Sequence, residues 1–208
     1  MADQIYILGI GPGSEEYLLP ITRRLATEAD VLIGGRRALD LFSDLNKEEL
    51  VIKADLEKIL NFIKENYQQR QIAVLVSGDP GLYSMLNYLG RHFERQHLEV
   101  IPGVSSLQLG FARAKLVWQD AYITSLHGRS KDELVDILAK EEKVGFFTDH
   151  KFPPNQIAEF LLAKGVTDKR AFVGERLSYA DERSIDATLT EISEYEDFGM
   201  SVMVIYDE

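Results

Sequence analysis

A histidine and an arginine that flank Gly128 are residue types suited to proton transfer and to carboxylate binding. His127 and Arg129 come shortly after the apolar run 121–124. A neutral imidazole can accept a proton near neutral pH, and a guanidinium binds a carboxylate through two parallel hydrogen bonds. Arg36-Arg37, after the apolar run 31–33, offers the same carboxylate recognition. A structural histidine and a solvated arginine pair at a helix start remain the alternatives.

Three glycine-containing turns form a second chemical feature. Each follows a short apolar run, and the turns are Gly9-Ile-Gly-Pro-Gly13, Ser77-Gly-Asp-Pro-Gly81 and Pro102-Gly103. A bare glycine lets a ligand approach the backbone, and Asp79 could accept hydrogen bonds from ligand hydroxyl or amino groups. A plain Asp-Pro turn, in which Asp79 bonds its own backbone, is the structural alternative.

The first turn departs from the dinucleotide-binding pattern that it superficially matches. That pattern requires glycine where this chain has Ser14, and Pro12 lacks the N–H that a phosphate would use. An NADP-linked oxidoreductase that uses Gly9–Gly13 and Arg36-Arg37 remains an alternative. The chain has no Cys, and its four histidines form no ligand pattern, so we expect no protein-bound metal and no cysteine nucleophile.

Alternating apolar runs and amphipathic segments must position these residues. The first half predicts strands and helices in parallel βαβ order, with strands at 5–8, 31–33, 50–52, 72–76 and 98–101 and helices at 18–29, 55–69, 82–95 and 105–114. The second half predicts strands at 121–124, 144–147, 171–174, 184–188 and 201–206 and helices at 131–140 and 153–164. We therefore expect an α/β fold with two domains, 1–116 and 117–208. The short link between 171–174 and 184–188 predicts antiparallel pairing.

Composition narrows the class of protein. The 208 residues carry 23 Lys and Arg against 34 Asp and Glu, a formal net charge of −11, which disfavours nucleic-acid binding. No run approaches the ~18 apolar residues of a membrane span, and the N-terminus has no basic segment typical of a signal sequence. We expect a soluble, cytoplasmic protein with no nucleic-acid or membrane partner.

Taken together, the turn motifs carry a resemblance to a known family. Gly-Ile-Gly-Pro-Gly at 9–13, Ser-Gly-Asp-Pro-Gly at 77–81 and Ile-Pro-Gly-Val-Ser-Ser at 101–106 occur in the order typical of the tetrapyrrole (corrin/porphyrin) methylases. The chain resembles that family over nearly its whole length. Thr-Ser-Leu-His-Gly-Arg at 124–129 and Gly-Glu-Arg-Leu-Ser-Tyr at 174–179 are similar to the subgroup that methylates C5 of precorrin-7 or cobalt-precorrin-7 in cobalamin biosynthesis.

The resemblance implies a fold, a cofactor and a set of site residues. It implies the tetrapyrrole methylase fold, two α/β domains with the cofactor cleft between them, with S-adenosyl-L-methionine bound and S-adenosyl-L-homocysteine released. The implied cofactor-binding positions are Gly9, Pro12, Ser77, Gly78, Asp79, Leu82, Ser105, Ser106, Thr148 and Ala187. The family often has glycine where this chain has Ala187.

The same resemblance implies roles in binding a polycarboxylate macrocycle. Arg36, Arg37 and Arg129 would bind its acetate and propionate arms, with Arg113 and Arg176 behind them. A base, if one acts, would be His127, Glu175 or Asp149, in that order.

The resemblance also implies partners. It implies a homodimer and a separate C15-methyltransferase and decarboxylase subunit, with any cobalt arriving inside the substrate. Methylation at another ring position remains an alternative. A non-catalytic module is a further alternative, which three bare glycine turns disfavour, because a protein without a ligand would have no evident need to keep them bare.

Overall fold

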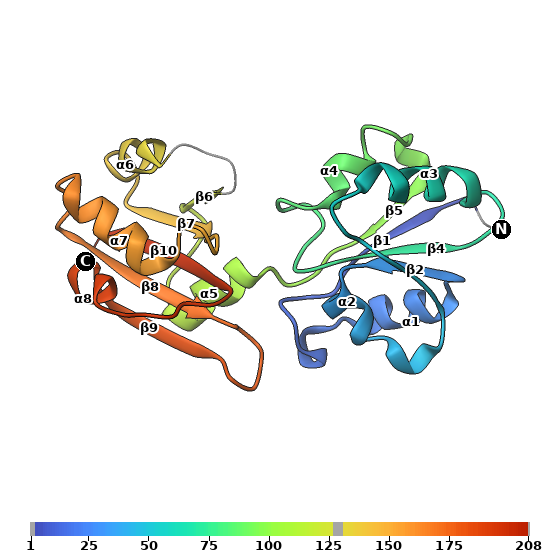
Figure 1. The fold of residues 1–208 in the computed structure, drawn as a ribbon, viewed down its shortest axis with the longest axis horizontal. Coiled ribbons are helices and arrows are strands. Elements are labelled where there is room, and N and C mark those ends of the chain that lie inside the picture. Colours follow the sequence, from blue (N-terminus) through green and yellow to red (C-terminus); the bar gives the residue numbers. More distant parts are fainter. Residues whose placement is uncertain (1–2, 127–130, 208) are drawn as a thin grey trace. The chain divides into compact units, whose positions relative to one another are not determined.

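The computed structural model describes residues 3–126 and 131–207. These residues fold into two compact units, divided between Ser105 and Ser106. Each unit contains one five-stranded sheet with helices packed on it (Figure 1). The two sheets differ in topology, as the short connections of the second half predict. The α/β class inferred from the alternating pattern is confirmed.

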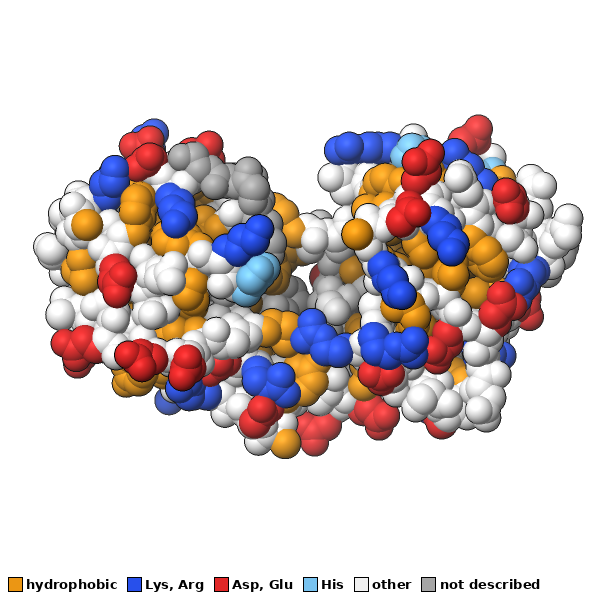
Figure 2. Space-filling model, viewed as in Figure 1, with side chains coloured by type: hydrophobic (Ala, Val, Ile, Leu, Met, Phe, Trp, Pro, Cys, Tyr) orange, Lys and Arg blue, Asp and Glu red, His pale blue; other side chains and the backbone are white. Residues whose placement is uncertain are grey.

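Charged side chains of both signs are interspersed over the face shown in Figure 2. Charged side chains also form ion pairs, such as that of Arg24 Nη1 with Glu28 Oε1 one helical turn away at 2.9 Å. None of the helices among the described residues is long and apolar enough to cross a membrane.

The first unit is built on a fully parallel sheet of order β3-β2-β4-β1-β5. Its strands are β1 Ile5–Gly9, β2 Val31–Gly34, β3 Glu48–Val51, β4 Ile72–Val76 and β5 Leu98–Ile101. All five residues of β4 are buried, because helices cover both faces of a parallel sheet. One face packs Leu8, Leu32 and Leu75 under α1 and α2, and the other packs Ile7 and Val74 with α3 and α4.

The helices of the first unit begin and end at recognisable signals. They are α1 Pro20–Glu28, α2 Arg36–Asp40, α3 Leu56–Asn66 and α4 Met85–Leu89, with short 3-10 turns at Glu15–Tyr17, Ser43–Leu45 and Arg95–His97. The predicted cap of α3 is confirmed, since the Lys58 N–H donates to Asp55 Oδ1 at 3.1 Å.

The prediction of one helix over 82–95 is wrong. Helix α4 begins only at Met85, because Tyr83 has a left-handed φ of 50° and Ser84 is extended. The Ser84 hydroxyl then accepts from the Leu86 N–H at 3.4 Å as the N-cap.

The second unit has a mixed sheet of order β6-β7-β10-β8-β9. Its strands are β6 Tyr122–Ser125, β7 Lys143–Phe147, β8 Lys169–Glu175, β9 Arg183–Thr188 and β10 Ser201–Asp207. Only β6 and β7 are parallel, and the antiparallel pairing predicted between β8 and β9 is confirmed. Because the sheet is mixed, its loops alternate between two edges instead of collecting at one.

Helix α5, Ser106–Ala114, packs on β7, β8 and β10 of this second sheet. Phe111 forms a buried cluster with Phe172 and Val204. Gly110 lies so close to the sheet that a Cβ atom there would be 2.9 Å from Val202 Cγ2. The boundary between the compact units therefore falls between Ser105 and Ser106, not at 116/117, because tertiary packing assigns α5 to the second sheet.

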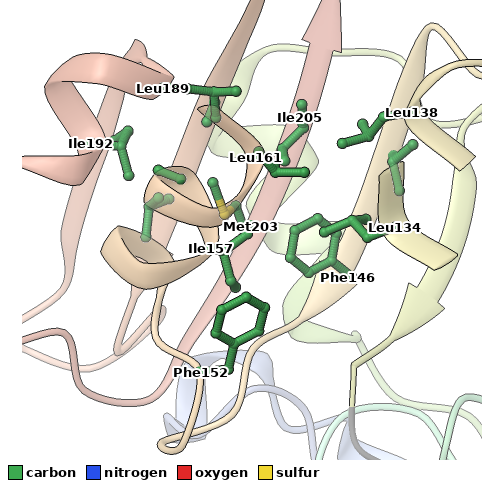
Figure 3. Close-up of a cluster of buried hydrophobic side chains, with 14 of the residues drawn as sticks. Leu134, Leu138, Phe146, Phe152, Ile157, Leu161, Leu189, Ile192, Met203 and Ile205 are labelled. Carbon is green, nitrogen blue, oxygen red and sulfur yellow. The ribbon is translucent and has the colours of Figure 1, made fainter. Parts of the chain in front are cut away.

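The opposite face of the second sheet carries the larger core, shown in Figure 3. It is covered by α6 Asp132–Leu138, α7 Pro154–Ala163 and α8 Leu189–Ser193. Phe146 and Met203 of the sheet meet Ile157 and Leu161 of α7. Sequence analysis did not predict α8, although Thr-Leu-Thr-Glu at 188–191 is a capping box, in which Thr188 and Glu191 bond each other's backbone.

Candidate functional site

The carboxyl edge of the first sheet brings the three glycine turns together, as their sequence positions predict. The turns follow β1, β4 and β5, which are neighbours in the sheet. The Gly78 N–H donates to the Gly11 carbonyl at 2.7 Å, and Gly11 donates back to Gly78 at 3.4 Å. We call this set of turns, 9–13, 77–81 and 102–103, the glycine edge. Ligands of parallel α/β sheets bind at such edges.

The glycines of this edge are required by contacts between the turns themselves. A Cβ atom on Gly103 would lie 2.3 Å from the Gly78 carbonyl oxygen, and one on Gly9 would lie 2.5 Å from the Gly103 nitrogen. Only glycine permits so close an approach of backbone to backbone. The argument that bare turns disfavour a non-catalytic module is therefore wrong, because the fold alone demands these glycines.

Asp79 ties two of the turns together. Its Oδ1 accepts from the Gly81 N–H at 2.7 Å, which is the Asp-Pro turn that we gave as the structural alternative. Its Oδ2 accepts from the Gly103 N–H at 3.1 Å. The half-buried carboxylate keeps further lone pairs on both oxygens, so it could still accept from a ligand.

The other predicted positions of the first unit differ in exposure. Pro12 and Ser105 are buried, Leu82 is half-buried, and Ser77 is exposed. An exposed serine, a half-buried carboxylate and a half-buried leucine thus occur on one short stretch, Ser77 to Leu82, which begins in the glycine edge. This combination suits a ligand with both apolar parts and cationic or hydroxyl groups.

Arg36 and Arg37 begin α2, directly after β2, which neighbours β4. Both are exposed, and Arg36 Nη1 lies 3.1 Å from Glu49 Oε2. An exposed ion pair contributes little, about 0–1 kcal/mol, so its arginine can change partners at low cost. Arg36 therefore places exchangeable positive charge at the carboxyl edge of the first sheet, and the exposed Arg37 adds a second positive charge there.

The second unit collects two further predicted residues at one edge of its sheet. Thr148 follows β7, and Glu175 ends β8 beside the start of β10. The Thr148 hydroxyl donates to the Ser201 carbonyl at 2.8 Å. The buried Glu175 accepts from Arg183 Nε at 2.7 Å and from the Gly199 N–H. Both of its oxygens are thus engaged within the fold.

His127 and Arg129 lie outside the described residues. The strand before them, β6, ends at Ser125, which pairs with Phe147 at the same edge as Thr148. Asp149 forms a tight turn in which its Oδ1 accepts from the Lys151 N–H at 2.9 Å and lies 2.9 Å from His150 Nδ1.

Ala187 lies elsewhere in the second unit. It is buried within β9, opposite Ala171, four residues along from Arg183 at the edge. It lines a cavity of about 570 Å³ together with Ser184, Ile185, Asp186, Glu191, Glu194 and Tyr195. The structure of this unit therefore does not bring Ala187 to the edge that holds Thr148 and Glu175.

Arg113 and Arg176 both pair with carboxylates of the β8–β9 loop. Glu182 receives Arg113 Nε at 2.5 Å and Nη2 at 3.3 Å, and its pKa is lowered chiefly by that hydrogen bonding. The Ser178 N–H donates to the same carboxylate at 2.7 Å. Arg176 lies 2.5 Å from Asp181. The sequence motif contained Asp181-Glu182, but spacing alone did not indicate that Glu182 organises the loop.

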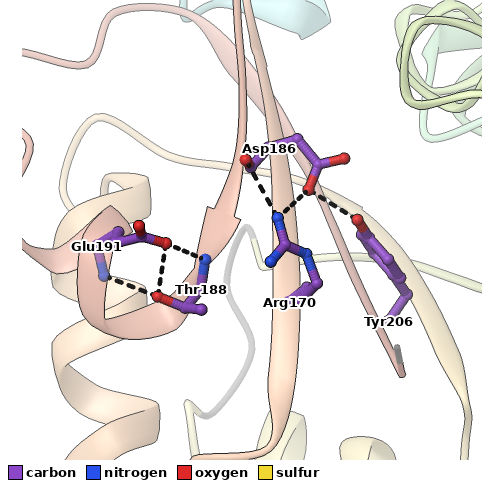
Figure 4. A network of polar contacts seen from close by, with 5 residues as sticks. All are labelled: Arg170, Asp186, Thr188, Glu191 and Tyr206. Carbon is purple, nitrogen blue, oxygen red and sulfur yellow. Dashed lines mark hydrogen bonds and ion pairs between the residues drawn. The ribbon is translucent and has the colours of Figure 1, made fainter.

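A second polar cluster serves the sheet itself (Figure 4). Asp186 on β9 accepts from Tyr206 at 2.7 Å and lies 3.3 Å from Arg170 on β8. Burial, with the Asp186 hydrogen bond, raises the pKa of Tyr206. These contacts link β9, β8 and β10, so the cluster supports the strand register.

Sequence reasoning missed Gly11 and Gly103 as members of the site. Both are needed for the contacts of the glycine edge. The signal was present, because both glycines stand in turns that the sequence singled out. The sequence could not show which of these glycines the fold requires, because it does not show which turns are in contact.

Most of this chain is similar in sequence to proteins of one known family. The family model of the Tetrapyrrole (Corrin/Porphyrin) Methylases matches residues 4–193. A probable cobalt-precorrin-7 C(5)-methyltransferase of Methanocaldococcus jannaschii is 35% identical, covering 98% of this chain and 97% of that protein. A decarboxylating precorrin-6Y C(5,15)-methyltransferase of Sinorhizobium is 31% identical over 85% of this chain but only 43% of its own length.

The fold is similar to that of a solved relative with a bound cofactor product. A uroporphyrin-III C-methyltransferase from Thermus thermophilus, complexed with S-adenosylhomocysteine, superimposes with a TM-score of 0.77 at 24% identity. The match covers 98% of this chain and 97% of that one.

Proposed function

Because this chain belongs to the tetrapyrrole (corrin/porphyrin) methylases, we propose that it is an S-adenosylmethionine-dependent methyltransferase of cobalamin biosynthesis that methylates C5 of precorrin-7 or cobalt-precorrin-7. The observation that carries the proposal is the similarity to the M. jannaschii relative, which extends over nearly the full length of both chains. The name of that relative supplies the C5 position and the substrate in the proposal.

The glycine edge is where we place part of the S-adenosylmethionine site. S-adenosylmethionine supplies an activated methyl group on a sulfonium centre. Asp79 would accept from its amino or hydroxyl groups, and Pro12 and Leu82 would shield it from water. The proposed site also uses Gly9, Ser77, Gly78 and Ser105 of the first unit and Ser106, Thr148 and Ala187 of the second.

Arginines would hold the polycarboxylate macrocycle in the proposed reaction. Arg36, Arg37 and Arg129 are the proposed partners of its acetate and propionate arms, because a guanidinium matches a carboxylate in charge and in geometry. Positioning of this kind supplies much of the catalysis when the transferred group is already activated. Arg113 and Arg176 are weaker candidates, because Glu182 and Asp181 already pair with them.

A base could accept the proton that the ring system releases after methylation. His127 is our first candidate, because a neutral imidazole has a pKa suited to that step. Glu175 and Asp149 follow, since each already accepts a backbone N–H within the fold. We propose no protein-bound metal, and any cobalt would enter with the substrate.

The proposed assembly is a cytoplasmic homodimer that works with a separate C15-methyltransferase and decarboxylase. The Sinorhizobium relative supports the second part, because its name combines C5 and C15 methylation and this chain matches only 43% of its length.

The first test is calorimetric titration with S-adenosylhomocysteine, with NADPH run in parallel. We expect micromolar binding of S-adenosylhomocysteine at about one site per chain and no binding of NADPH. Next, precorrin-7 and cobalt-precorrin-7 are incubated with methyl-labelled S-adenosylmethionine, and the new methyl carbon is located by NMR. Arg129→Ala should raise the KM for the macrocycle and spare S-adenosylhomocysteine binding. Labelling at another ring carbon, or failure of the folded protein to bind S-adenosylhomocysteine, would contradict the proposal.

A further inference from the structure

Tyr83 has an unusual backbone conformation for an aromatic residue. It lies between the turn 77–81 and α4, with a φ of 50°. A side chain larger than that of glycine is disfavoured there, because its Cβ atom crowds the following carbonyl oxygen. The side chain is also 52% exposed, so burial in the core does not explain why an aromatic residue stands here.

The chain on both sides of Tyr83 is held in place. The Leu82 N–H donates to the Asp79 carbonyl at 3.2 Å, and the Ser84 hydroxyl donates to the Pro80 carbonyl. Ser84 also caps α4. A disfavoured conformation persists only where the surroundings determine it, and such conformations gather at functional sites.

Three of the other five non-glycine residues with positive φ have ordinary explanations that Tyr83 lacks, and the remaining two, Arg176 and Ser178, lie in the β8–β9 loop. Asn46 and Asp197 are of types that tolerate this conformation, and Lys115 comes directly after the last residue of α5, where left-handed residues are usual. Tyr83 instead precedes a helix. It is the one aromatic residue with positive φ in the described part of the chain.

The position of Tyr83 relates it to the glycine edge. Asp79, which joins two turns of that edge, is four residues away, and Leu82 is adjacent. The proposed cofactor positions Asp79 and Leu82 are half-buried and Pro12 is buried, whereas Tyr83 is exposed beside them. Its ring is thus accessible to a ligand larger than the one that these positions would hold.

We propose that Tyr83 is a positioning residue whose ring packs against the apolar body of the macrocyclic substrate, an inference that rests on the proposed function. A tyrosine ring offers a large rigid contact surface at a low cost in conformational entropy. Held by the surrounding turn, it would orient the ring system toward the transferred methyl group. The charged rim of the macrocycle would remain with the arginines.

The test compares Tyr83→Asn with Tyr83→Phe in the full-length protein. Asn tolerates positive φ but removes the ring, whereas Phe keeps the ring. For Tyr83→Asn we expect an unchanged or raised Tm, an unchanged Kd for S-adenosylhomocysteine, and a KM for precorrin-7 about tenfold higher. Tyr83→Phe should behave as the wild type. Lys115→Gly is the matched control, since it relieves a positive φ at a residue that is not among the proposed site residues, and it should leave KM unchanged.

Three results would overturn the inference while leaving the proposed function intact. The first is an unchanged KM for Tyr83→Asn, and the second is a Kd of that variant for S-adenosylhomocysteine that rises in parallel with its KM. The third is a change in the sedimentation coefficient of Tyr83→Asn relative to the wild type, which would assign Tyr83 to a subunit interface. Absence of macrocycle methylation by the wild-type protein would instead contradict the proposed function, and this inference would fail with it.

Discussion

The loops at the two sheet edges that hold the predicted site residues are held together by different kinds of contact. At the glycine edge, backbone meets backbone, with Gly78 bonded to Gly11 at 2.7 Å and Gly103 pressed against the Gly78 carbonyl. At the edge of the second sheet, side chains make the connections, as Glu175 does with Arg183 and Gly199.

This difference affects how each edge can be recognised and how it can be altered. Close backbone contact excludes every side chain, so it appears in the sequence as glycine at fixed positions. Side-chain contact can be made by many residue types, so it leaves no comparable pattern. The glycine edge should therefore tolerate substitution poorly, and the second edge should lose stability in smaller steps.

The largest effect should come from Gly103→Ala. The new Cβ atom would lie 2.3 Å from a backbone oxygen that cannot move independently. We expect the free energy of unfolding to fall by about 3 kcal/mol or more and S-adenosylhomocysteine binding to be lost. Urea unfolding and calorimetry measure both. Gly35→Ala is the control, since nothing lies within 4 Å of its Cβ position, and it should change stability by less than about 1 kcal/mol. Equal effects of the two substitutions would contradict the account of the glycine edge.

Asp79→Ala should have the next largest effect. It removes a carboxylate that accepts two backbone N–H groups and joins two turns. We expect a loss of about 2 kcal/mol in stability, with the fold retained, and about tenfold weaker S-adenosylhomocysteine binding. Asp55→Ala, which removes the cap of α3 alone, should reduce stability by about 1 kcal/mol and leave binding unchanged. Unchanged affinity in Asp79→Ala would exclude Asp79 from the binding site.

Glu175→Gln tests the side-chain edge. The amide can still accept from Gly199, but it loses the charge that pairs with Arg183. We expect the free energy of unfolding, measured with urea, to fall by about 1–2 kcal/mol and the pH profile of kcat to stay unchanged. The exposed pair Arg24–Glu28 supplies the control, since Glu28→Gln should reduce stability by only about 0.3–0.5 kcal/mol. Loss of the acidic limb of the pH profile, where a base becomes protonated, would instead identify Glu175 as the catalytic base.

Glu182→Gln should have the smallest effect and one that depends on pH. Hydrogen bonding from Arg113 lowers the pKa of Glu182 in the folded state, so its contribution is present above the ordinary glutamate pKa of about 4.3. That contribution is lost as the pH falls through the lowered value. The free energy of unfolding of the wild type should exceed that of the variant by about 1 kcal/mol at neutral pH, and the difference should vanish in acid. Urea unfolding across this range measures it, and a difference that grew in acid would have the wrong sign.

Most strands of both units could be predicted because short apolar runs are distinctive. The buried run 72–76 is strand β4, with the predicted limits. Helices were less predictable where local contacts compete with periodicity. The turn conformation of Tyr83 and the cap at Ser84 shorten the helix expected over 82–95, and no pattern of apolar spacing reports either.

The sequence by itself determined the parallel order of the first half, the three glycine turns and the resemblance to a methylase family. These depend on backbone geometry and apolar spacing, which local residue types report directly. Tertiary structure alone decided that α5 packs on the second sheet. It also decided that contacts between the turns require glycine, and that Glu175 and Glu182 form ion pairs with Arg183 and Arg113. Each of these depends on which surfaces meet across long sequence separations, and a side chain's type does not specify its distant partner.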